Sequence, residues 1–161
     1  MEIYFEKLIT NSLEFEIDLM KDADKKDAKY NIFTNDKKEH IGTIEGYILK
    51  NNDFFSVVRI NPEFQGKGFG FEAFNKVFQE LNAKNNITEI HGSWHKDEEF
   101  SDCIDGMSTN LKAFKEESKM KTNLSECAFI TPTGKWAKKL GFNTCEILQN
   151  SDTTVKVVFK K

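Results

Sequence analysis

The sequence contains few prolines and cysteines, a single arginine and no long apolar run. Two prolines, three cysteines and Arg59 stand among its 161 residues. No stretch approaches the roughly 20 apolar residues that a membrane helix needs, and the N-terminus lacks the basic start and apolar core of a signal peptide. We therefore expect a cytoplasmic protein with no membrane contact, and the length fits one domain over 1–161.

The three cysteines, Cys103, Cys127 and Cys145, are odd in number and far apart in the sequence. They form no Cys-x-x-Cys pair, so the sequence has neither a disulfide framework nor a zinc-binding cysteine motif. We predict reduced thiols and no metal site. The net charge of −3 argues against binding to nucleic acids, whose phosphates attract basic proteins.

A glycine-rich turn is the most informative stretch that the sequence does contain. It reads Gln65-Gly66-Lys67-Gly68-Phe69-Gly70, after an apolar run over 54–60 and before an amphipathic run over 71–81. A strand, a turn and a helix in this order direct unpaired backbone N–H groups at one point, and the helix dipole adds positive potential there. This arrangement predicts an anion site, usually one for phosphate.

The glycine spacing fits neither of two common phosphate loops. No Lys-Ser/Thr pair follows the glycines, as a Walker-type loop requires, and their spacing differs from Gly-x-Gly-x-x-Gly. With Pro62 and the preceding apolar strand, Gln-x-x-Gly-x-Gly instead resembles the acetyl-CoA pyrophosphate loop of the GNAT acetyltransferase superfamily. The segment 134–142, which ends Leu140-Gly141-Phe142, is similar to the end of that family's last helix.

The resemblance covers about 40–95 and 131–159 well, but it covers the N-terminus and 96–130 poorly. It implies an α/β fold of the GNAT type, in which a mixed, mostly antiparallel twisted sheet carries helices on its faces around a central strand, glycine loop and helix. The family usually places two helices after its first strand, where this sequence predicts strands and a charged loop. We expect the insertion at 96–130 to replace those helices as a cover for the acceptor.

The resemblance also implies a reaction, in which an amine attacks acetyl-CoA directly in a ternary complex. The amine would belong to a small molecule or to a protein. The implied cofactor-binding residues are Val58 and Ile60, through their backbone, and Gln65, Gly66, Lys67, Gly68, Phe69 and Gly70. Many family members protonate the leaving thiolate with a tyrosine on the last helix, but the matching residue here is Ala137.

The attacking amine needs a base, because a primary amine with a pKa near ~10 is mostly protonated at neutral pH. His91 is the candidate, since it lies on a predicted strand beside the cofactor and an unperturbed histidine titrates near ~6.5. A strand histidine with no catalytic role is the alternative. Asp53 and Glu63 are interpreted as structural or solvated.

The periodicity of apolar residues predicts the order of helices and strands. Strands are expected over 2–9, 13–19, 30–34, 41–49, 53–60, 87–94, 143–148 and 153–159. Helices are expected over 68–82, 109–120 and 134–140, with Ser108 and Thr133 as N-caps and Gly141 as a C-terminal stop. The lysine-rich stretch 21–29 is expected to be a loop. A strand, helix and strand over 53–94 favour a parallel crossover.

Two other functions stay open at this point. The missing tyrosine and the altered N-terminal region also fit a non-catalytic CoA-binding or interaction domain. A nucleotide-binding protein with a similar glycine loop is the third possibility. The oligomeric state is expected to be a monomer or a homodimer, and the acceptor is not identified.

Overall fold

The computed structural model describes residues 13–17, 26–36, 39–96 and 108–161. They form seven strands and four α-helices, and the strands are hydrogen-bonded in the order β1-β2-β3-β4-β5-β7-β6. The β4–β5 pair is parallel, whereas the β1–β2, β2–β3, β5–β7 and β6–β7 pairs are antiparallel. This mixed, mostly antiparallel sheet with helices confirms the predicted fold class and the predicted parallel crossover.

The chain divides into two compact units, and β4 contributes to both. The first unit comprises the described residues up to Lys50 together with Ser56–Ile87, and the second comprises Asn51–Phe55 and the described residues of 88–161.

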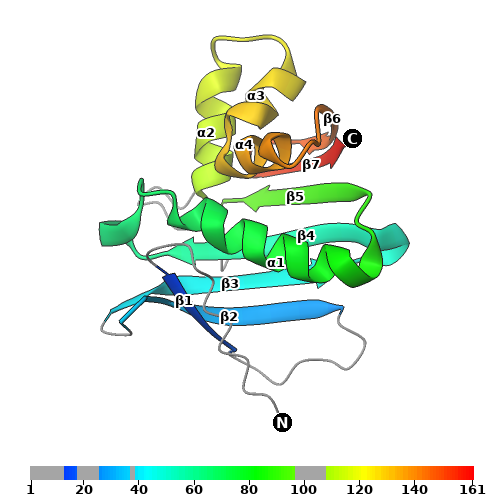
Figure 1. The fold of residues 1–161 in the computed structure, drawn as a ribbon. Helices are drawn as coiled ribbons and strands as arrows, with labels where there is room; N and C mark the ends of the chain where they lie inside the picture. Colours follow the sequence, from blue (N-terminus) through cyan, green and yellow to red (C-terminus); the bar gives the residue numbers. More distant parts are fainter. Residues whose placement is uncertain (1–12, 18–25, 37–38, 97–107) are drawn as a thin grey trace. The chain divides into compact units, whose positions relative to one another are not determined.

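The first unit is an antiparallel meander with one long helix. Its strands are β1 (Leu13–Ile17), β2 (Asp27–Thr34), β3 (His40–Ile48) and the end of β4 (Asp53–Ile60), and its helix is α1 (Phe69–Asn85). In Figure 1, α1 runs along the sheet and packs on β2 and β3. Its buried face contains Phe74, Val77, Phe78 and Leu81, and burying large side chains of this kind contributes roughly 1.5–3 kcal/mol each.

A polar contact also fixes α1 on the meander. The Tyr30 hydroxyl on β2 donates to the Glu80 carboxylate at 2.7 Å. The buried Lys76 places its Nζ atom 5.1 Å from the centre of the Tyr30 ring and 5.7 Å from that of Phe15. These contacts hold the helix axis, and with it the glycine turn that precedes the helix, in a defined position.

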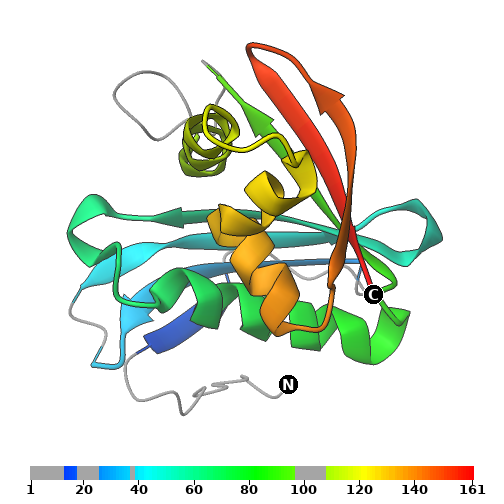
Figure 2. The same ribbon diagram turned by 90° about the horizontal axis from the view of Figure 1, so that it is seen from above.

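The second unit packs three short helices against a three-stranded segment of sheet. The strands are β5 (Glu89–His95), β6 (Thr144–Asn150) and β7 (Thr154–Lys160), and the helices are α2 (Thr109–Ser118), α3 (Leu124–Ile130) and α4 (Pro132–Lys139). Figure 2 shows the helices on one side of the β6–β7 hairpin. Aromatic pairs join the layers: the rings of Trp94 and Phe114 lie 6.1 Å apart, and those of Phe129 and Phe159 5.3 Å.

Several predicted boundaries were wrong, and pairing explains the largest difference. β2 begins at Asp27, inside the stretch expected to be a loop, because Asp27, Ala28 and Lys29 pair with β3 residues in an antiparallel register. Regular backbone pairing therefore overrides a polar local sequence, as strand propensity is weak. The strand expected over 2–9 lies outside the described residues, as do 18 and 19 at the end of the next one.

The cap of α4 was also predicted at the wrong threonine. Thr131, not Thr133, accepts a hydrogen bond from the Gly134 N–H at 3.0 Å, and Pro132 occupies the first helical position, where its missing N–H costs nothing. The other two helix-end predictions are confirmed. Ser108 caps α2 by accepting from the Leu111 N–H, and Gly141 follows α4 with a φ of 94°.

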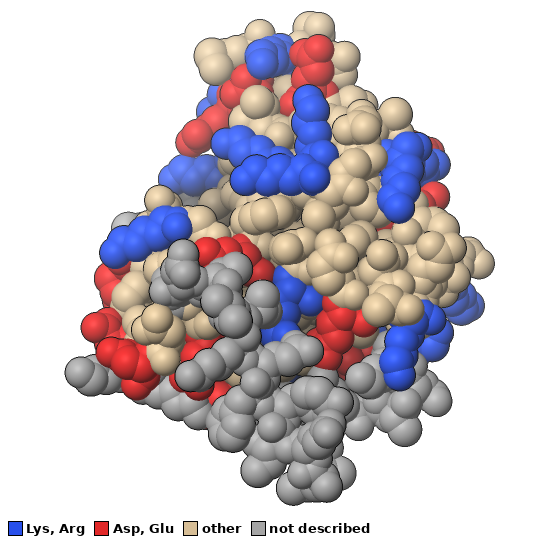
Figure 3. All heavy atoms as spheres, viewed as in Figure 1, with Lys and Arg blue, Asp and Glu red and all other residues tan. Residues whose placement is uncertain are grey.

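Among the described residues, no helix is both long and apolar enough to cross a membrane. Figure 3 shows one face of the molecule, and both acidic and basic side chains lie on the described part of it.

Candidate functional site

The glycine turn between β4 and α1 is braced from within. A short 3-10 helix, η2 (Pro62–Phe64), follows β4. The Gln65 N–H donates to the Pro62 carbonyl at 3.2 Å, and the Gln65 side-chain amide donates to the Ile60 carbonyl at 2.8 Å. Gln65 therefore supports the turn with both its amides, and the residues whose N–H groups can meet a ligand are those from Gly66 to Gly70.

Two of the glycines are required by backbone conformation. Gly66 and Gly68 have φ values of 78° and 83°, in the left-handed region that other residues rarely adopt. Gly70 lies in the first turn of α1 and has no positive φ. A glycine at this position therefore leaves space that a side chain would fill, and no unusual dihedral requires it. The sequence pattern thus encodes the local turn directly.

The first turn of α1 begins without a side-chain cap. Gly68 is the N-cap residue and offers no side chain, and the Glu72 N–H bonds to its carbonyl at 3.2 Å. The N–H groups of Phe69 and Gly70 precede that bond, so the i→i−4 ladder does not use them. Gly66, Lys67 and Gly68 are exposed. An exposed, uncapped helix start of this kind is suited to an anion.

Lys67 and two phenylalanines flank the turn. The Lys67 Nζ atom lies 5.8 Å from the centre of the Phe64 ring, and the rings of Phe64 and Phe69 lie 6.4 Å apart. The Lys67 side chain is exposed.

The last residues of β4, which precede the turn, are held by contacts with β3. Val58 and Ile60 are half-buried, and Arg59 between them is exposed, as alternation predicts. Gly42 on β3 allows a close approach, because a Cβ atom there would lie 1.9 Å from the Arg59 carbonyl oxygen. The Asn61 N–H then donates to the Ile41 carbonyl at 2.8 Å.

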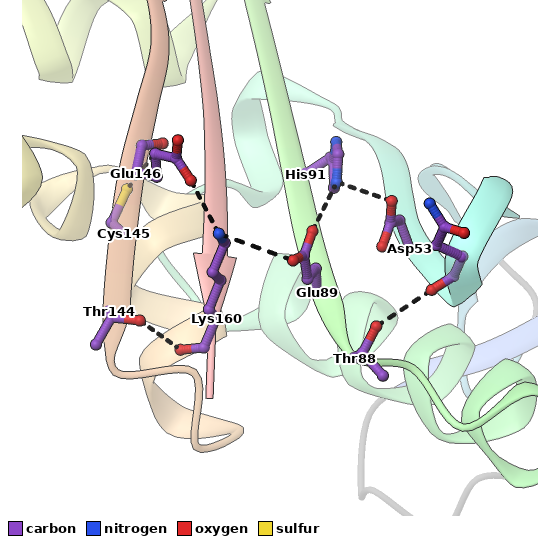
Figure 4. Close-up of polar contacts among 9 residues, drawn as sticks. Asp53, Thr88, Glu89, His91, Thr144, Cys145, Glu146 and Lys160 are labelled. Atoms are coloured by element: carbon purple, nitrogen blue, oxygen red, sulfur yellow. Dashed lines mark hydrogen bonds and ion pairs between the residues drawn. The ribbon is translucent and has the colours of Figure 1, made fainter.

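A second cluster of reactive side chains lies in the second unit, where β4 and β5 pair. The parallel register aligns Asp53 with Glu89 and Phe55 with His91. The His91 Nε2 atom lies 3.2 Å from the Asp53 carboxylate and 3.4 Å from the Glu89 carboxylate, as Figure 4 shows. The structure thus brings the predicted base His91 together with Asp53, which the sequence marked as structural.

The electrostatics of this cluster are unusual for a half-buried position. The His91 Nε2 atom is buried and forms no aligned hydrogen bond with a described residue, although two carboxylates stand beside it. Burial raises the pKa of the Asp53 carboxyl, the His91 side chain opposes that rise, and the Glu89 carboxylate adds to it. Two carboxylates at one imidazole therefore create local negative potential.

Sequence reasoning did not identify Glu89 as a member of this cluster. A parallel β4–β5 pair was predicted, and alternation places Glu89 and His91 on one face of β5. The register of that pair depends on packing, so the sequence did not reveal that Asp53 faces them.

Ala137 and two polar residues, Asn110 and His95, make structural contacts in the second unit. Ala137 is fully buried in α4, and its carbonyl accepts the Phe142 N–H at 3.0 Å. The Asn110 side chain accepts from the Thr133 N–H at 3.0 Å and so connects α2 to α4. His95 lies 2.8 Å from the Ser93 hydroxyl through its Nε2 atom.

The chain matches a known protein family. A model of the acetyltransferase (GNAT) family matches residues 2–98. This range contains β4, the glycine turn, α1 and β5, and it ends before α2. It also includes the N-terminal region, which the resemblance in the sequence was expected to cover poorly. No curated protein sequence matches the chain.

Solved structures with a related fold are distant in sequence. They include a GNAT-family acetyltransferase of Bordetella pertussis (11% identity, TM-score 0.49), the N-acetyltransferase PseH of Campylobacter jejuni with acetyl coenzyme A (12%, 0.45) and the spermidine N-acetyltransferase of Vibrio cholerae with CoA and spermine (14%, 0.47). The alignments cover 84%, 84% and 86% of this chain, and the chain spans 66%, 69% and 68% of those proteins.

Proposed function

Because the chain belongs to the acetyltransferase (GNAT) family, we propose that it transfers an acetyl group from acetyl-CoA to an amine of a small molecule or a protein. This proposal rests on the glycine turn. The turn combines two glycines whose backbone is in the left-handed region with an exposed, uncapped helix start, which is an arrangement suited to a pyrophosphate.

The N–H groups from Gly66 to Gly70 would donate to the pyrophosphate oxygens of acetyl-CoA. The positive end of the α1 dipole favours the negative charge there. Lys67 adds a mobile cation, which strengthens hydrogen bonds to phosphate. Gln65 holds the turn open by its bonds to Pro62 and Ile60, so little ordering of the loop would accompany binding.

The thioester arm of acetyl-CoA would extend along the end of β4. The backbone groups of Val58 and Ile60 would bond the amides of the pantetheine arm and the thioester carbonyl. A backbone N–H aimed at that carbonyl would stabilise the oxyanion that forms when the amine attacks. The half-buried side chains of both residues would shield the arm from water.

The chemical step follows from the groups involved. A neutral amine attacks the thioester carbon, the tetrahedral intermediate collapses, and the CoA thiolate leaves and takes a proton. Ala137 cannot supply that proton, so we propose water as its source. For the proton acceptor, His91 stays a prediction from the sequence.

Titration calorimetry with acetyl-CoA, CoA and ATP tests the site. Gly68→Asp should lower the affinity for both CoA forms by more than tenfold, because a like charge at a phosphate costs several kcal/mol. Gly141→Asp is the matched control, since Gly141 also has a positive φ and no atom near an added Cβ. Wild-type affinity in the Gly68→Asp variant would refute the site, and binding of ATP alone would favour a nucleotide-binding protein.

One observation favours a second function, a CoA-binding domain without catalysis. The family's usual tyrosine position holds the fully buried Ala137, so this position offers no acid. A thiol-release assay with acetyl-CoA and a panel of amines separates the two functions. Release that depends on an amine supports the transferase, whereas tight CoA binding without release favours the binding domain.

A further inference from the structure

The cluster of Asp53, Glu89 and His91 is not explained by the proposed acetyl transfer. One ligand atom from each of the three residues lies within 4.8 Å of the other two. The side chains are only 14%, 32% and 28% exposed, respectively. The His91 Nε2 atom is itself buried and forms no aligned hydrogen bond with a described residue, although the Asp53 carboxylate lies 3.2 Å away. A buried nitrogen with an unused lone pair or N–H between two carboxylates needs a partner.

The distances in the cluster differ from those of charge-assisted hydrogen bonds. Such bonds between nitrogen and a carboxylate usually measure about 2.7–2.9 Å, whereas Nε2 lies 3.2 and 3.4 Å from the two carboxylates. Tetrahedral zinc with Zn–N and Zn–O bonds of about 2.0–2.2 Å separates two of its ligand atoms by about 3.3–3.5 Å. The two observed nitrogen–oxygen separations therefore match, within about 0.1 Å, those of ligands on one metal ion.

We propose that Asp53, Glu89 and His91 bind a divalent transition-metal cation, for which Zn²⁺ is the reference ion. One imidazole nitrogen and two carboxylate oxygens are ligands that zinc accepts, and a water molecule would complete four-coordination. The two negative charges would balance the charge of the ion.

The strand pairing places these ligands for a structural role. Asp53 lies at the start of β4, and Glu89 and His91 lie on β5, in a parallel register. An ion held by all three would join the two strands inside the second unit. A coordinated His91 nitrogen would not accept a proton, so this role and that of catalytic base exclude each other.

Among the described residues, Lys160 forms an ion pair with the cluster. Its Nζ atom lies 3.9 Å from the Oε1 atom of Glu89 and 2.9 Å from Glu146. The Oε2 atom of Glu89 faces His91. The lysine therefore occupies the opposite oxygen and leaves the metal-facing one available.

The experiment uses the full chain, stripped with EDTA and dialysed. Zn²⁺ titration by calorimetry should give one site per chain, and Co²⁺ should give the visible absorption of a tetrahedral ion. His91→Gln and Asp53→Asn should each weaken Zn²⁺ binding more than about 100-fold, because loss of even an outer-shell partner costs roughly 10–100-fold. His95→Gln, on the same face of β5, is the matched control and should bind like the wild type.

The outcomes decide the inference in both directions. Loss of binding in the two cluster variants, with retention in His95→Gln and native circular dichroism in all three, supports it. Absence of Zn²⁺ binding by the wild-type protein overturns it, and so does wild-type affinity in His91→Gln. Acetyl-CoA affinity, measured in the same samples, is expected not to change, which separates this test from that of the proposed function.

Discussion

The Nε2 atom of His91 on β5 lies 3.2 Å from the Asp53 carboxylate on β4. On its other side, Glu89 connects His91 to Lys160 on β7, and Lys160 contacts Glu146 on β6 at 2.9 Å. Polar contacts therefore run across four strands of the second unit (Figure 4). Cross-strand pairs of this type stabilise a sheet by small amounts each, and they make the cluster sensitive to changes at its neighbours.

Lys160→Gln should tighten Zn²⁺ binding a few-fold. The substitution removes a positive charge that lies 3.9 Å from Glu89, and solvent screens that charge because the lysine side chain is exposed. Calorimetry at low salt measures the gain, and high salt should reduce it. Lys156→Gln, on the same strand, is the control. Weaker binding in the Lys160 variant would show that the lysine organises the site.

Gly134→Ala should destabilise the protein by about 1–3 kcal/mol, the usual cost of overpacking. Alanine normally stabilises a helix interior relative to glycine. Here, a Cβ atom would lie 2.0 Å from the Ala128 carbonyl oxygen and 2.7 Å from the Phe129 Cα atom, so α3 and α4 would have to separate. Urea unfolding measures the change, and Lys135→Ala on the exposed side of α4 should stay within about 0.5 kcal/mol of the wild type.

Thr131→Val should cost about 1–2 kcal/mol of unfolding free energy, as the loss of a helix cap does. The buried Thr131 hydroxyl accepts from the Gly134 N–H at 3.0 Å and donates to the Ala128 carbonyl at 2.6 Å. Valine keeps the shape of the side chain but leaves both backbone groups without this partner. Thr131→Ser keeps the hydroxyl and should lower the free energy of unfolding much less. Equal decreases in the two variants would contradict the capping role.

Cys145 should resist alkylation in the folded protein at pH 8. Burial raises the pKa of its thiol to about 12, and the Glu146 carboxylate adds to the rise. The reactive thiolate is then present at roughly one part in 10⁴, compared with about a quarter for a free cysteine. Peptide mapping after iodoacetamide treatment, with a urea-unfolded control, measures the difference. Rapid labelling of folded Cys145 would show that the thiol is accessible and ionised.

The glycine turn shows what could be predicted from local sequence. Gly66 and Gly68 adopt left-handed backbone that other residues avoid, so glycines at these two positions indicate a tight turn whatever packs around them. The apolar spacing of Phe74, Phe78 and Leu81 predicted α1 for the same reason, because helix periodicity is a property of neighbouring residues. The strand, turn and helix around this site were therefore predictable.

Details of helix ends and strand starts were less predictable. The sequence predicted Thr133 as the cap of α4, whereas in the folded backbone Thr131 is the residue that bonds the Gly134 N–H. β2 likewise extends back to Asp27 because β3 supplies backbone partners there. In both cases a contact formed on folding decides where the element begins.

The sequence by itself determined the family, the glycine turn and the order of most helices and strands, because each depends on residues close together in the chain. Only the tertiary structure brought Asp53 to Glu89 and His91. A parallel register is set by the packing of whole strands, and shifting it by one residue would turn these side chains to opposite faces. A site assembled across that register therefore has no signature in the local sequence.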